Sequence, residues 1–191
     1  MRFATALCRE QGGRKENEDS LLGLRRAEKD AFVLVGADGL GGHGNGLLAS
    51  QTAVKAIGEG FIQQPCLEAE YLTELFQRAN QEILSMQSPT NQMRSTAAAL
   101  FYHRGRLAAG YIGGIRIYRF RGGKILYQSK DHSVPQMEVD AGEITPEEIR
   151  FHPDRNRLLR ALGEESCRPT ITLLGRARPK DAFLICTDGF W

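Results

Sequence analysis

Two aspartates that each precede a glycine are the residues of this sequence best suited to carry chemistry. Asp38 ends the apolar run FVLVGADG, and Asp188 stands at the end of FLICTDG. Both runs are rich in β-branched and aromatic residues, so each aspartate is expected at the end of a buried strand. A rigid strand would hold its carboxylate in a fixed place. The alternative is that Asp-Gly is only a common turn dipeptide.

A third acidic cluster strengthens the first interpretation. The stretch NEDS contributes Glu18 and Asp19 near the start of the chain. Several carboxylates that converge on one point repel each other unless protons or metal ions neutralise them. Oxygen ligands of this kind suit Mg²⁺ or Mn²⁺ better than Zn²⁺. The pattern therefore predicts a site for a hard divalent cation.

The glycines after Asp38 allow a competing interpretation. Gly39, Gly41 and Gly44 have the spacing of the dinucleotide-binding fingerprint. That fingerprint also requires a returning strand about 20 residues later with an acidic residue for the ribose. Here a helical pattern is followed by a second helical pattern, and a carboxylate beside a pyrophosphate is unfavourable without a cation. No phosphate-binding loop of the G-x-x-x-x-G-K-[ST] type occurs, so a nucleotide-binding enzyme is disfavoured.

The elements that must position these residues follow an α+β order. Apolar residues recur at helical spacing in two successive segments, and a β-rich stretch with tight turns follows them. The absence of a strict strand–helix–strand alternation favours antiparallel sheets. The expected elements are a strand at 31–38, helices at 47–62 and 68–86, three or four antiparallel strands in a meander over 95–128, short helices at 146–149 and 156–162, and a strand in 179–191.

Bulk properties limit the classes of function. The chain has 191 residues and a formal charge of +2, so it gives no strong electrostatic case for binding nucleic acid or an anionic membrane. No apolar run is long enough to cross a bilayer, and the N-terminus lacks the apolar segment of a signal peptide. The four cysteines are scattered without zinc spacing, and each is expected to be a small buried hydrophobe. A cytoplasmic location is therefore expected.

Taken in order along the chain, these motifs resemble the metal-dependent protein phosphatases (PPM type, also called type 2C) in their compact bacterial form. The resemblance extends from the N-terminal region to the last residue, and it rests on the order of the motifs more than on any one of them. The matching segments are GRKENEDS, ADGLGGHGNG, RSTAAAL, YIGGIRIYRFRGG, SKDHS, RNRLLRALG and FLICTDGFW.

The resemblance implies a four-layer α/β/β/α sandwich, in which two antiparallel sheets are flanked by helix pairs. It implies hydrolysis of phosphoserine and phosphothreonine in proteins by a water that bridges two Mn²⁺ or Mg²⁺ ions. Phosphoprotein substrates and an opposing Ser/Thr kinase are the implied partners. Residues 1–191 would form a single phosphatase-like domain that lacks the final helix and strand of the family.

Residue roles are implied in the same way. Arg14 would hold the substrate phosphate, because its planar fork matches phosphate geometry. No general acid is assigned: His43 would shape the loop, and Leu40 occupies the place of the histidine found in the eukaryotic branch. The implied metal ligands are Asp38 bridging both ions, the Gly39 carbonyl on one, Asp188 on the other, and Asp19 and Glu18 acting on the ions directly or through bound water.

Two departures from the family pattern define the alternative function. The family's Gly-Asp pair reads Gly113-Gly114, which predicts an absent or weakened third metal site. The chain stops at Trp191, before the family's last metal-binding aspartate. The alternative is therefore a catalytically degenerate module with a binding or regulatory role. The shortened fold also predicts marginal stability or pairing of strand edges between two chains.

Overall fold

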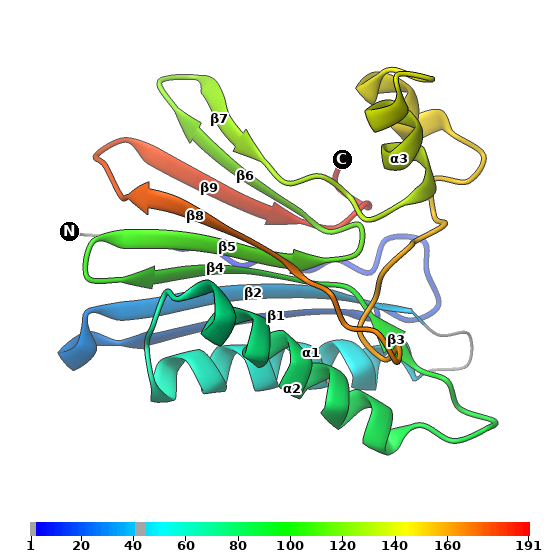
Figure 1. Ribbon diagram of the computed structural model, residues 1–191, viewed down its shortest axis with the longest axis horizontal. Coiled ribbons are helices and arrows are strands. Elements are labelled where there is room, and N and C mark those ends of the chain that lie inside the picture. Colours follow the sequence, from blue (N-terminus) through cyan, green and yellow to red (C-terminus); the bar gives the residue numbers. More distant parts are fainter. Residues whose placement is uncertain (1–2, 41–44) are drawn as a thin grey trace.

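Two antiparallel sheets form the centre of the computed structural model, which describes residues 3–40 and 45–191 (Figure 1). The larger sheet has the order β1-β2-β4-β5-β8, with β3 paired to the end of β2, and the smaller sheet has the order β7-β6-β9. The strands of the larger sheet are β1 (Asp19–Arg26), β2 (Ala31–Leu40), β3 (Arg94–Ser95), β4 (Ala97–His103), β5 (Arg106–Ile112) and β8 (Thr170–Arg176), and those of the smaller sheet are β6 (Arg116–Arg121), β7 (Lys124–Gln128) and β9 (Asp181–Cys186).

Two long helices cover the outer face of the larger sheet (Figure 1). Their apolar side chains recur every three to four residues, so each helix presents one stripe to the strands. Ile57 and Phe61 of one helix and Phe76 of the other are fully buried against Phe101 and its neighbours. The helices are α1 (Gly46–Gln63) and α2 (Ala69–Met86), and the shorter elements are α3 (Val134–Ala141), η1 (Ala27–Lys29) and η2 (Pro146–Phe151).

A second core lies between the two sheets. Alternate residues of β4 and β5 point away from the helices, as the two-residue period of a strand requires. Ala98 and Tyr111 pack there against Ile117 of β6, and Leu100 packs in the same layer against Phe183 of β9. The central strands β4 and β5 are therefore buried on both faces, which fixes the position of their ends.

The predicted α+β class and the two antiparallel sheets are confirmed. Both long helices lie where the periodicity places them, and the strand predicted at 31–38 extends two residues further, to Leu40. The predicted meander over 95–128 is wrong as a single sheet. After β5 the chain crosses from the larger to the smaller sheet at Gly113, whose φ of 95° is in the left-handed region that favours glycine.

Two further predictions are wrong. The segment 156–162 is not helical, because Leu158 and Leu162 form isolated bridges to Ser133 and Ser95 and hold the segment against other parts of the chain. Of the four cysteines, only Cys186 is buried. The sequence analysis also gave no sign of β1, β8 or α3.

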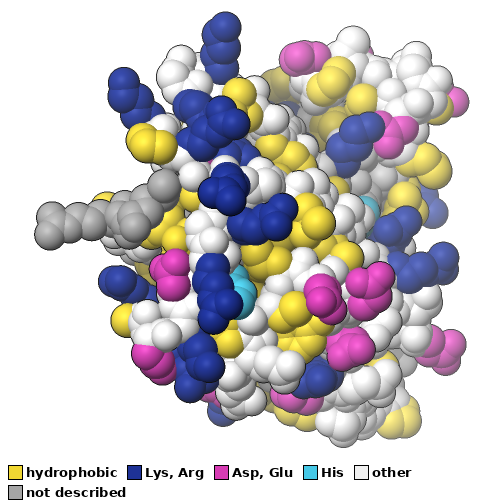
Figure 2. Space-filling view, turned by 60° about the vertical axis from the view of Figure 1, so that its left-hand side comes forward, with side chains coloured by type: hydrophobic (Ala, Val, Ile, Leu, Met, Phe, Trp, Pro, Cys, Tyr) yellow, Lys and Arg dark blue, Asp and Glu magenta, His cyan; other side chains and the backbone are white. Residues whose placement is uncertain are grey.

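The helix pair lies on one side of the sandwich, and no such pair covers the smaller sheet within residues 3–40 and 45–191 (Figure 1). Every helix in this part of the chain is too short or too polar to cross a bilayer. Lys and Arg side chains gather in a band over one end of the sheets, where several turns meet (Figure 2).

Candidate functional site

The pairing of β1 with β2 brings two of the predicted acidic residues together. In the antiparallel register Asp19 lies directly opposite Asp38. Directly opposed residues on one face of a sheet have Cβ atoms about 5 Å apart, so the two carboxylates are close neighbours. Asp19 lies two residues after Asn17, whose side-chain oxygen accepts a hydrogen bond from the Asp19 amide at 2.9 Å.

The backbone around Asp38 is held from the neighbouring strands. The Asp38 amide donates to the Thr96 hydroxyl at 3.0 Å, and the Thr96 amide donates back to the Asp38 carbonyl at 2.9 Å. The Ser95 hydroxyl also donates to that carbonyl, at 3.1 Å. These contacts fix the position of the Asp38 side chain without occupying its carboxylate.

Asp188 reaches the same region from the other end of the chain. It follows β9 in a turn that is closed by a hydrogen bond from the Phe190 amide to the Thr187 carbonyl, at 3.1 Å. The Thr187 hydroxyl donates to the Asp19 carboxylate at 3.1 Å, which ties this turn to the start of β1. Residues 168 apart in sequence are thus adjacent in the fold.

The carboxylates of the acidic cluster are close enough to change the pKa values of Asp19 and Asp38. Burial first, and then the charges of Asp19, Asp188 and Glu18, raise the pKa of Asp38 to about 7, while the charge of Arg14 opposes them. Burial also raises the pKa of Asp19, with Asp188 adding to the effect. Asp19 and Asp38 therefore resist ionisation where they lie, and a bound cation would stabilise their charged forms.

Gly39 has a different role from the turn residue that the sequence suggested. It lies inside β2 and pairs with Ser95. A Cβ atom added at Gly39 would lie 2.1 Å from the carbonyl oxygen of Gly46, at the start of α1. A Cβ atom at Gly46 would in turn lie 2.6 Å from a carboxylate oxygen of Glu18. The two glycines allow α1 to begin directly beside the acidic cluster.

Arg14 lies in an exposed turn before β1. Its amide donates to the Gln11 carbonyl at 3.3 Å, and the Gln11 side chain donates to the Arg14 carbonyl at 2.8 Å. Its charge lowers the pKa of Asp38, so Arg14 lies within electrostatic reach of the acidic cluster, and its phosphate-binding role stays a prediction. The predictions made for Gly41, His43 and Gly44 lie outside the described residues.

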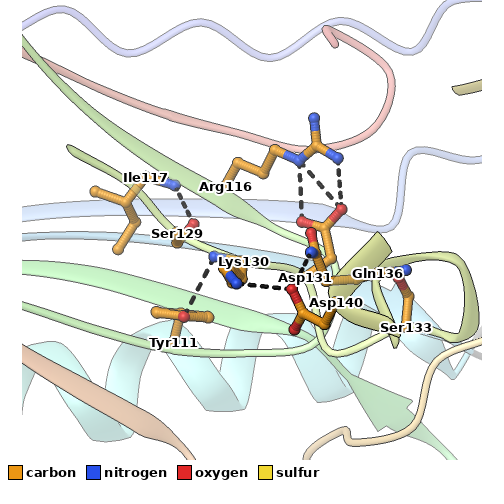
Figure 3. Close-up of polar contacts among 9 residues, drawn as sticks. All are labelled: Tyr111, Arg116, Ile117, Ser129, Lys130, Asp131, Ser133, Gln136 and Asp140. Atoms are coloured by element: carbon orange, nitrogen blue, oxygen red, sulfur yellow. Dashed lines mark hydrogen bonds and ion pairs between the residues drawn. The ribbon is translucent and has the colours of Figure 1, made fainter. Parts of the chain in front are cut away.

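A buried ion pair beside the site was missed by the sequence analysis. Arg116, at the start of β6, donates to both carboxylate oxygens of Asp131 at 2.6–3.1 Å (Figure 3). Both side chains are buried, and the Arg116 guanidinium lies 3.2 Å above the ring of Trp191. Asp131 interacts electrostatically with Asp188, so the pair adjoins the acidic cluster. The motifs YIGGIR and SKDHS contain both residues, but their contact depends on the register in which β6 pairs with β7.

The donor types fit a hard divalent cation. Carboxylates of Glu18, Asp19, Asp38 and Asp188 and the Gly39 carbonyl form an all-oxygen set, which Mg²⁺ and Mn²⁺ prefer. The pKa of Asp38 is raised because its carboxylate is buried among other carboxylates, and a cation there would favour the charged form. Within the described ranges, however, no group of three or more His, Cys, Asp or Glu side chains is arranged so that it could hold a metal ion. These carboxylates would have to move closer together to bind one.

Comparison with known families agrees with this order of motifs. The family model described as protein phosphatase 2C matches residues 11–191. The chain belongs to the protein phosphatase 2C family. The bacterial branch is indicated by its relatives: the Ser/Thr phosphatase stp of Listeria monocytogenes serovar 1/2a is 30% identical over 184 residues, which cover 92% of this chain and 73% of that protein.

A second relative is much longer than the matched region. The Ser/Thr protein phosphatase PstP of Mycobacterium tuberculosis is 33% identical over 180 residues, and the match covers 92% of this chain. The chain spans about a third of the length of that relative, since the match covers 34% of it.

Solved structures confirm the PPM fold. The crystal structure of M. tuberculosis PstP/Ppp superposes with a TM-score of 0.77 at 35% identity, covering 92% of this chain and 74% of that one. A structure of the PstP catalytic domain in complex with two manganese ions gives a TM-score of 0.78 at 32% identity, covering 92% of this chain and 73% of that one.

Proposed function

We propose that this chain hydrolyses phosphoserine and phosphothreonine in proteins, with the help of Mn²⁺ or Mg²⁺. The observation that carries the proposal is the gathering of Glu18, Asp19, Asp38 and Asp188 at one end of the sheets, with Arg14 within electrostatic reach. Membership of the protein phosphatase 2C family supports it, as does the manganese bound by PstP.

The chain's own residues have separate tasks in this proposal. Asp38 and Asp188, with Asp19, Glu18 and the Gly39 carbonyl, would hold the cations. When bound, two such ions lower the pKa of a water molecule and neutralise phosphate charge. Arg14 would orient the substrate phosphate by donating two of its guanidinium N–H groups in parallel. The hydrogen bonds from Thr96 and Thr187 would keep the Asp38 backbone and the Asp19 carboxylate in place.

The test is phosphate release from a phosphothreonine peptide, with and without Mn²⁺. We expect activity that requires Mn²⁺ and that falls at least about 100-fold in Asp38→Asn, because one carboxylate of the cluster is lost. Asp140→Asn, which changes an exposed carboxylate on α3, is the matched control and should keep its activity. Mn²⁺-dependent activity that survives in Asp38→Asn would contradict the proposal.

A binding or regulatory role is the second candidate, and two observations favour it. Among the described residues no three acidic side chains are arranged as a metal site, and glycine stands at position 114, where the family has aspartate. Calorimetric titration with Mn²⁺ separates the two functions. Saturable binding that Asp38→Asn weakens would favour the phosphatase, whereas no binding together with no phosphate release would favour the regulatory module.

A further inference from the structure

The turns at the end of the sheets opposite the acidic cluster carry an excess of basic residues. We call the turn segments 26–30, 103–106, 119–124 and 176–181 the basic end. Their contacts join them into one surface: the Arg104 amide donates to the Asp30 carbonyl, the Ala177 amide donates to the Gly105 carbonyl, and Arg121 pairs with Asp181 across two strands. Figure 2 shows the resulting band of Lys and Arg side chains.

The charge of the basic end is much larger than that of the whole chain. These segments contain ten Lys and Arg residues and three Asp and Glu residues, which gives a formal charge of +7. Because the chain as a whole carries +2, the remaining residues carry −5. The small net charge therefore conceals one strongly basic surface, and the compensating negative charge is spread over the rest of the chain.

Most of these cations are free to meet an external partner. Asp181 is buried and paired with Arg119 and Arg121, and Glu28 is paired with Arg26. The remaining basic side chains are exposed, and none of them forms an ion pair with any residue in the described part of the chain. They are Lys29, Arg104, Arg106, Lys124, Arg176, Arg178 and Lys180.

Two of the exposed cations occupy positions that favour other residues. Arg104 has φ = 48° in the two-residue turn between β4 and β5, and Lys180 has φ = 67° in the turn before β9. Positions with positive φ in such turns favour Asn or Gly. A third non-glycine residue with positive φ among the described residues, Asp30, also lies at this end. The chain thus presents positive charge at turn tips against the local conformational preference.

We propose that the basic end binds an anionic lipid surface. Its cations stand on the tips of neighbouring turns, which suits contact with a broad charged plane, whereas peptides are usually recognised by a groove or a free sheet edge. Exposed apolar side chains lie next to the cations: Ile125 follows Lys124, and Phe3 packs on Phe32 near the start of β2. A mixture of cations and apolar side chains fits the lipid interface better than the phosphates of duplex DNA.

The orientation that follows is compatible with the proposed phosphatase site. The paired strands β1 and β2 run between the basic end and the acidic cluster, as β1 does from Asp19 to Arg26. A protein bound through its basic end would therefore turn Asp38 and Asp188 away from the lipid. Lipid binding is independent of catalysis in this arrangement, so it can be tested without an activity assay.

The experiment measures binding of the 191-residue chain to vesicles of phosphatidylcholine containing about one-third phosphatidylserine, at low salt. The test variant is Arg104→Asn/Lys180→Asn, because asparagine suits both turns while it removes two charges. Each lost cation should weaken binding about fivefold, so the double variant should bind about 25-fold more weakly. Its melting temperature should be equal or higher, which shows that the fold is retained.

The matched control is Lys55→Gln/Arg78→Gln, which removes two exposed charges from α1 and α2 and should bind like the unmodified chain. Vesicles of phosphatidylcholine alone should not bind. Failure of the unmodified chain to bind the anionic vesicles would overturn the proposal, and so would an equal loss in both double variants. Tighter binding to duplex DNA or to polyglutamate than to the vesicles would assign the basic end to another class of partner and would also overturn it.

Discussion

His132 is a partly buried imidazole that the fold holds in its neutral form. Its Nδ1 accepts a hydrogen bond from the Gly113 amide at 3.1 Å, so this nitrogen carries no proton. Its Nε2 is therefore the donor in the 2.9 Å contact with the Thr170 hydroxyl, and the ring stacks on Tyr111. Burial, and secondarily the charge of Arg160, lower the pKa of His132 to about 4.

This lowered pKa predicts a loss of stability in mild acid. In the unfolded chain His132 takes up a proton near its ordinary pKa of 6.5, whereas in the folded protein it does so only near 4. The free energy of unfolding should fall between these pH values, by up to about 2 kcal/mol because the ring keeps some contact with solvent. Urea unfolding at about pH 7.5 and about pH 5 measures this. His132→Asn should show a smaller fall, and an equal fall in both proteins would refute the assignment.

At the scale of residues, the part of the site that could be predicted is the part marked by a repeated sequence pattern. Asp38 and Asp188 each end an apolar run, and that pattern was enough to predict their approach to Asp19. The ion pair of Arg116 with Asp131 was not predictable, because its partners lie 15 residues apart on either side of a hairpin. Only the paths of β6 and β7 bring them together.

At the scale of elements, the contact between β2 and α1 sets the position of the acidic cluster. Gly39→Ala should place a methyl group where the Gly46 backbone lies, and neither backbone can move without shifting the helix. We expect a loss of about 3 kcal/mol or more in the free energy of unfolding. Gly13→Ala is the control, because a Cβ atom there meets nothing within 4 Å. Equal stability of the two variants in urea would show that α1 is not held against β2 as described.

Helical periodicity of apolar residues predicts the two long helices correctly but fails for the segment 156–162. Helices α1 and α2 were predictable because their apolar residues form one continuous stripe over 18 residues each. The segment 156–162 has similar spacing, but Leu158 and Leu162 bridge to two separate strand ends. Its apolar residues therefore serve tertiary contacts that a short helix could not make, and a local pattern does not distinguish these cases.

At the scale of the whole molecule, the antiparallel course of the strands determines which end of the sheets carries the basic turns. The antiparallel order places every second connection at the same end, so the basic turns gather at one end of the strands and the facing pair Asp19 and Asp38 lies at the other. A net charge of +2 gave no sign of this separation, because a sum over the sequence discards position. The expectation of no membrane contact rested on that sum, and it is the expectation that the proposed lipid surface would reverse.

The smaller sheet leads to the last prediction, which concerns association between chains. Its edge strand β7 exposes Ile125 and Leu126, and no helix pair covers this sheet among the described residues. Unprotected apolar edges pair with other edges, so we expect a dimer that forms as concentration rises from micromolar to millimolar. Leu126→Lys should abolish it in sedimentation velocity, because lysine at an edge opposes pairing. Met137→Lys changes an equally exposed apolar residue on α3 and should still dimerise. A monomer at all concentrations would show that β7 is protected without a partner.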